Sequence, residues 1–70
     1  MSSIAKVIEV IAESEKSWDD ALKNAVTEAG KTVENITEVW VGSMKAVVEN
    51  NKVTKYRITA KVTFVLKRSK

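Results

Sequence analysis

Trp40, Met44, Arg57 and Lys61 are the residues whose types and spacing point most clearly to binding chemistry. An indole offers a flat apolar surface for stacking, and arginine and lysine donate hydrogen bonds to a phosphate or a ring carbonyl. Together they predict a site for a flat, anionic ligand. The alternative is that the same residues pack against other copies of the chain, with Trp40 as the interface anchor. The pattern alone leaves both interpretations open.

The chain lacks the residue types that most catalytic sites need. It has 70 residues with no cysteine and no histidine, which excludes disulfides, zinc sites built on these ligands, and thiol or imidazole catalysis. No serine and lysine form an activated nucleophile, and Gly30 and Gly42 lie too far apart for a phosphate-binding loop. Asp19 and Asp20 are adjacent, so they point in different directions on a helix, and helix capping explains them better than acid–base chemistry. We therefore expect a protein that is not an enzyme.

Length and charge narrow the class further. We expect a single domain over residues 1–70, and a chain this short is only marginally stable alone, which favours self-association. There is no apolar run long enough for a membrane span and no secretion-leader pattern, so we expect a cytoplasmic protein with no membrane partner. The net charge of +3 is accounted for by the cluster Lys67, Arg68 and Lys70. That cluster fits a solvated tail better than nucleic-acid binding.

Hydrophobic periodicity predicts the order strand, helix, strand, strand, in an α+β fold. Alternating apolar residues indicate the strands, and an apolar stripe at helical spacing, which starts at Trp18, indicates the helix. Trp18 itself is interpreted as a core residue or a subunit contact. The predicted elements are a strand over Ser3–Ala12, a helix that follows the N-cap Ser17 and ends near Val33, and strands over Ile36–Glu49 and Val53–Lys67 joined by a hairpin turn at Asn50–Asn51.

The last strand is predicted to lie in the middle of a three-stranded antiparallel sheet, in the order 2-3-1. This follows because a returning helix leaves the first two strands parallel to each other. The two-residue turn places Val41 opposite Ala60. One helix covers one face of such a sheet, so the face that carries Trp40, Met44 and Arg57 is expected to stay uncovered. An uncovered apolar face predicts a partner.

Several segments together resemble the dodecins, and the resemblance covers nearly the whole chain. Its implied fold is a three-stranded antiparallel sheet curled around one helix, assembled as a hollow homododecamer. Its implied function is the binding of flavins (riboflavin, FMN or FAD) as stacked pairs between tryptophans, for storage and photoprotection rather than turnover. The segments that carry the resemblance are Ala5–Ile11, Ser14–Ala21, Lys31–Val33, Tyr56–Ile58 and Lys61–Phe64.

The resemblance also implies roles for single positions. The family's stacking tryptophan corresponds to Glu38, and Trp40 follows two residues later on the same face. The family's glutamine at the flavin ring edge corresponds to Arg57, and its phosphate-contacting arginine to Lys45. The expected flavin-binding residues are therefore Trp40, Arg57, Lys45, Glu38 and Met44.

Some dodecin-like proteins lack the tryptophan, carry a Tyr-Arg-Ile third strand like the one at Tyr56–Ile58, and are associated with metal ions. The alternative prediction is therefore a flavin-free structural or metal-ion-binding oligomer. In that version Trp40 packs at an interface, and the acidic Glu38 and Glu49 face channels between subunits.

Overall fold

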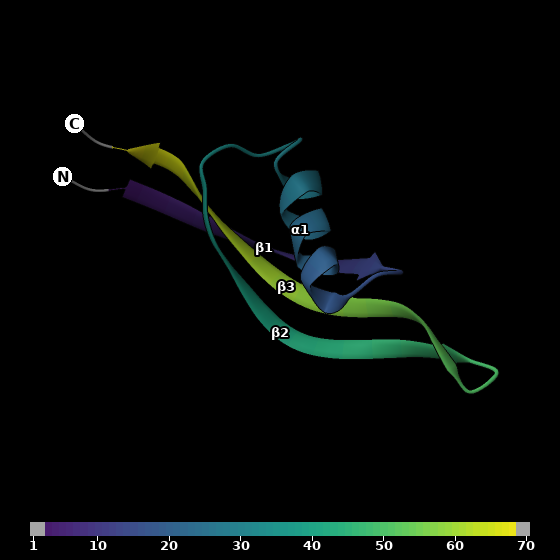
Figure 1. The fold of residues 1–70 in the computed structure, drawn as a ribbon. Helices are drawn as coiled ribbons and strands as arrows, with labels where there is room; N and C mark the ends of the chain where they lie inside the picture. The colour runs from purple at the N-terminus through teal and green to yellow at the C-terminus, as the bar shows by residue number, and fades with distance from the viewer. Residues whose placement is uncertain (1–2, 69–70) are drawn as a thin grey trace.

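The computed structural model describes residues 3–68, and the side chains of residues 4–66. The predicted order of elements is confirmed (Figure 1), and the predicted bounds of the second strand are matched. The first and third strands run slightly further than predicted, and the helix ends before Val33. The elements are β1 (Ser3–Ser14), α1 (Trp18–Ala29), β2 (Ile36–Glu49) and β3 (Lys52–Arg68).

Two hydroxyl groups fix the start of α1. Ser17 is extended, with φ −171°, and its side chain accepts a hydrogen bond from the backbone N–H of Asp20 at 3.0 Å, as expected of an N-cap. The carboxylate of Asp20 accepts a hydrogen bond from the Ser14 hydroxyl at 2.6 Å. The last residue of β1 is thereby tied to the first turn of the helix.

The helix stops at Ala29 because the chain tightens into turns there. Lys31 and Thr32 donate backbone hydrogen bonds to the carbonyls three residues earlier, at 3.2 and 3.1 Å. Asn35 then adopts a left-handed conformation, with φ 62°, and its carbonyl accepts from the backbone N–H of Val65 at 3.1 Å. Asparagine tolerates this conformation, so the helix ends in time for β2 to begin beside β3.

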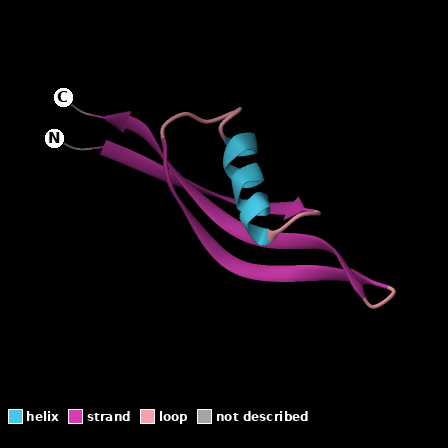
Figure 2. Cartoon of the chain, viewed as in Figure 1, coloured by secondary structure: helices cyan, strands magenta, loops and turns pink. Residues whose placement is uncertain are grey.

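The sheet is antiparallel in the order β1-β3-β2, which confirms the predicted 2-3-1 order. The helix packs on one face of it (Figures 1 and 2). Small side chains on α1 let the helix backbone approach the central strand closely. The buried hydrophobic residues are Ala21, Ala25 and Ala29 from α1, and Ile58, Ala60, Val62 and Phe64 from β3.

The hairpin turn and its nearby register follow the prediction, with one consequential exception. Asn50 and Asn51 are both left-handed, with φ 53° and 64°, and Val41 pairs with Ala60. The register then shifts between Val41 and Ser43, so that Gly42 is an extra, bulged residue. Beyond this bulge each β2 residue lies on the face opposite to the predicted one.

The prediction that Met44 shares a face with Trp40 is therefore wrong. Met44 pairs with Ile58, a buried residue on the helix side of β3. Lys45 takes its place, because it pairs with Arg57 on the uncovered face.

Candidate functional site

The candidate site lies on the sheet face opposite α1, where the side chains of all three strands form transverse rows. Trp40 on β2 is opposite Lys61 on β3, and Lys61 is opposite Glu9 on β1. Glu38 is opposite Thr63, one row away on the same face. The structure thus brings Trp40, Lys61 and Glu38 together, as the alternation of the strands predicts.

Trp40 is held in place from two directions although 59% of it is exposed. The ammonium group of Lys61 lies 5.2 Å from the centroid of the indole, which is within range of a cation–π interaction. On the other contact, the benzene ring of the indole lies against the backbone of Gly42. An indole placed in this way is a flat platform available to a second flat molecule.

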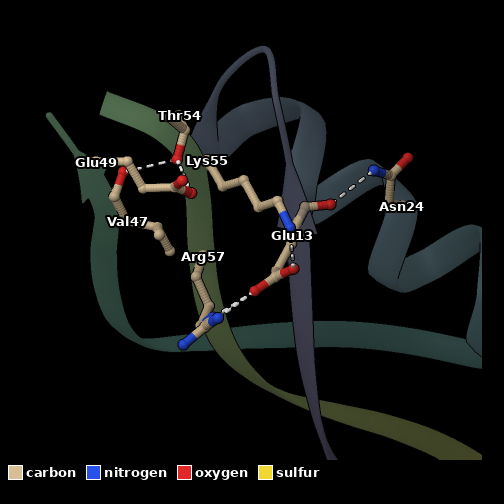
Figure 3. Close-up of polar contacts among 7 residues, drawn as sticks. All are labelled: Glu13, Asn24, Val47, Glu49, Thr54, Lys55 and Arg57. Atoms are coloured by element: carbon tan, nitrogen blue, oxygen red, sulfur yellow. Dashed lines mark hydrogen bonds and ion pairs between the residues drawn. The ribbon is translucent and has the colours of Figure 1, made fainter. Parts of the chain in front are cut away.

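A second row, nearer the hairpin end, carries charge. Lys45 is opposite Arg57, and Arg57 is opposite Glu13 on β1. The carboxylate of Glu13 accepts a hydrogen bond from Nε of Arg57 at 2.6 Å and forms an ion pair with its guanidinium (Figure 3). Lys55 reaches the same carboxylate at 4.0 Å. Arg57 is therefore largely neutralised by Glu13, whereas Lys45 has no carboxylate partner among residues 4–66.

Two neighbouring contacts steady this charged row from outside it. Asn24 of α1 donates a side-chain hydrogen bond to the backbone carbonyl of Glu13 at 3.1 Å. On the hairpin side, the Thr54 hydroxyl lies 3.3 Å from the carbonyl of Val47 and 3.4 Å from a carboxylate oxygen of Glu49. The backbones that carry Glu13 and Lys55 are thus fixed by groups that take no part in the row.

Met44, the remaining predicted site residue, lies elsewhere. It lines an apolar hollow of about 320 Å³ between α1 and β2, with Trp18, Leu22 and Val41 among its neighbours. The bulge at Gly42 is the reason, since it turns Met44 to the helix side.

Trp18 was expected to contact the core or another subunit, and the structure shows how it serves this site from beneath. It packs against the core cluster, and its ring meets Tyr56 edge to face, at 4.9 Å and 75°. Its Nε1 donates a hydrogen bond to the backbone carbonyl of Lys45 at 3.0 Å. The start of α1 is thereby bonded to the β2 residue that carries the unpaired cation. Nothing in the sequence spacing indicates this contact.

Two negative findings bound the chemistry. Among the residues that the structure describes, no three or more acidic, cysteine or histidine side chains gather into a potential metal centre. No helix within residues 3–68 has the length and apolarity needed to cross a bilayer.

Comparison with known proteins settles the family. A family model of the dodecins matches residues 4–67, which is nearly the whole chain. The chain belongs to the dodecin family. The resemblance noted from the sequence is therefore confirmed, and the site lies on the sheet of a dodecin.

Solved dodecins share this fold. A dodecin from Streptomyces coelicolor is 28% identical, with a TM-score of 0.89 and 96% of each chain covered. A dodecin from Thermus thermophilus, solved as a point mutant, is 22% identical with a TM-score of 0.89, covering 96% of this chain and 100% of the other. A calcium dodecin from Mycobacterium tuberculosis, described as a calcium-chelating antigen with a novel calcium-binding site, is 32% identical with a TM-score of 0.82 and 97% of each chain covered. The search of curated proteins found no significant match.

Proposed function

We propose that this dodecin is a non-catalytic protein that binds and stores flavin as a homododecamer. Family membership supports the assembly and the ligand class. The observation that carries the proposal is the exposed indole of Trp40, which lies on an uncovered sheet face beside cationic side chains. A flavin has a flat aromatic ring system, and FMN adds a phosphate, so indole and ammonium groups match both parts.

In this proposal Trp40 stacks on the isoalloxazine ring, and Lys45 contacts the ring edge or the phosphate. Arg57 lies in the same row and acts more weakly, because Glu13 already neutralises it. Glu38 flanks the tryptophan on the side away from Lys45. Met44, expected among the binding residues, has no part here since it faces α1.

The chain has two tryptophans, which makes the test specific. Micromolar riboflavin or FMN is titrated with the purified protein, and the loss of flavin fluorescence is followed. The Trp18→Phe variant keeps the platform and should still quench the flavin. The Trp40→Phe variant removes most of the platform and should quench it much less, with the assembly mass unchanged. Wild-type protein that leaves riboflavin fluorescence unchanged would refute flavin binding.

A second candidate function is ion binding, favoured by the 32% identity to the calcium dodecin. A calcium site needs several oxygen ligands, so Glu38 or Glu49 would have to meet carboxylates of other copies. Equilibrium dialysis against calcium tests this, with Glu38→Gln as the variant and Glu15→Gln as the control. In this version Trp40 is interface packing, and Trp40→Ala should destroy the assembly. An intact assembly that has lost only flavin binding would exclude it.

The expected cytoplasmic location and the absence of nucleic-acid binding stay predictions. The basic cluster Lys67, Arg68 and Lys70 lies outside the residues whose side chains the structure describes. A binding assay with and without the last four residues tests the nucleic-acid alternative.

A further inference from the structure

Gly42 is unusual because its backbone gives no reason for a glycine. No glycine among the described residues has a positive φ, so an L side chain suits the conformation at this position. The residue is exposed and lies inside β2, where glycine normally weakens a strand relative to alanine. Gly42 is the extra residue of the bulge, and bulges without a left-handed residue do not require glycine.

The space beside Gly42 does give a reason. A Cβ built on this residue would lie 2.6, 2.9 and 3.4 Å from three atoms of the Trp40 indole, namely Cζ3, Cη2 and Cε3. These three are the nearest heavy atoms outside its chain neighbours. The benzene ring of the indole therefore occupies the room that any other side chain would need.

We propose that Gly42 is a positioning residue that seats the Trp40 indole against the strand and so prepares it to stack on a flat aromatic ligand. The ligand part of this inference rests on the proposed flavin function. The seat and Lys61 together limit the indole to one orientation, although the side chain is mostly exposed. A binding platform that is already oriented loses less conformational entropy when the ligand arrives.

The seat itself is tested without any flavin. In the Trp18→Phe background Trp40 is the only tryptophan, so its emission and anisotropy report its ring alone. Gly42→Ala should shift the emission to the red and lower the anisotropy, because the ring is displaced into solvent. Gly30→Ala is the matched control, since Gly30 caps α1 far along the chain from Trp40. Unchanged emission and anisotropy in Gly42→Ala would overturn the proposal.

A variant pair keeps this test decisive if Gly42→Ala folds poorly. In a Trp40→Ala background the obstructing ring is gone, so Gly42→Ala should leave the melting temperature unchanged or raise it. An equal loss of stability with and without the tryptophan would show that Gly42 serves the backbone, and would overturn the proposal.

The consequence for binding is measured by FMN titration of wild type, Gly30→Ala and Gly42→Ala at equal assembly mass. Stacking of flat rings on an aromatic side chain contributes roughly a five- to hundredfold change in affinity. We expect Gly42→Ala to raise the Kd for FMN at least about fivefold and Gly30→Ala to leave it unchanged. Wild-type binding with an unaltered Kd in Gly42→Ala overturns the positioning role. Failure of wild type to bind FMN instead defeats the proposed function, and the emission measurement still decides whether the seat exists.

Discussion

Glu13 controls how much positive charge Arg57 presents on the uncovered face of the sheet. Its carboxylate is bonded to the Arg57 guanidinium and lies 4.0 Å from the Lys55 ammonium (Figure 3). The substitution Glu13→Gln keeps the size of the side chain and removes its charge. It leaves Lys45, Lys55 and Arg57 close together without that carboxylate.

The expected magnitudes follow from exposure. The side chains of Arg57 and Glu13 are 43% and 36% exposed, so solvent screens their ion pair. Such pairs contribute about 0–1 kcal/mol, and we expect the free energy of unfolding to fall by no more than that. Two unit charges about 4 Å apart interact by about 1 kcal/mol in water. A phosphate that meets the released guanidinium should therefore bind about three- to tenfold more tightly.

The assay compares FMN, which carries a phosphate, with riboflavin, which does not. The ratio of the two dissociation constants cancels any effect of the substitution on assembly or on stacking. Glu13→Gln should shift the ratio toward FMN by about three- to tenfold at low salt, and the shift should shrink as salt screens the charges. Glu15→Gln makes the same charge change outside the three rows, and it should leave the ratio unchanged.

Two results would refute the reasoning. If both flavins gain affinity equally, the carboxylate acts on the ring or on the assembly and not on the phosphate. If neither changes, the row of Lys45 and Arg57 does not contact the ligand.

Three further predictions concern the fold itself and are measured by denaturant or thermal unfolding at fixed protein concentration. Ile58→Ala removes a core side chain that is 1% exposed and should lower the free energy of unfolding by about 2–5 kcal/mol; a loss below about 1 kcal/mol would mean that the site collapses around the cavity. Asn51→Val should lower the melting temperature and Asn51→Gly should not, because a β-branched residue resists the φ of 64° at this turn; equal melting temperatures would contradict the observed hairpin. Ser17→Ala should cost about 1 kcal/mol and Ser17→Asn far less, since the N-cap acceptor is lost only in the first; equal losses would show that the hydroxyl is not the cap.

The fold could be predicted from the sequence because its signals are local. Alternation set the strands, the N-cap at Ser17 set the start of α1, and two asparagines set the hairpin turn. The end of the helix was placed too late, at Val33, because the residues after Gly30 continue the apolar spacing. The chain leaves the helix there to reach β2, and that requirement is tertiary.

The site was predicted less completely, for one physical reason. A strand register read from a turn assumes that every residue pairs, and a single bulge reverses the faces beyond it. Gly42 was the available signal, since a glycine inside a strand often marks a bulge. With the bulge included, Lys45 would have been placed beside Arg57 from alternation alone, and Met44 would have been placed under α1. The Glu13–Arg57 pair needed the β1–β3 register, which no turn defines.

The structure of one chain also limits what the site can be without other copies. Hollows of about 400, 330 and 320 Å³ lie away from Trp40, so a flavin on the indole would be covered on one side only. Ligands of this size usually bury most of their surface. On the same sheet face Val7 and Ile11 of β1 are 53% and 69% exposed, which is costly for a chain with so small a core.

Both deficits are removed by the same event, the packing of a second copy on this face. We therefore expect folding, assembly and flavin binding to be lost together on dilution, in sedimentation velocity and circular dichroism run on the same samples. A folded single chain that persists at low concentration would show that water tolerates this face. Trp40 would then be a surface residue, and the pocket between copies would lose its physical basis.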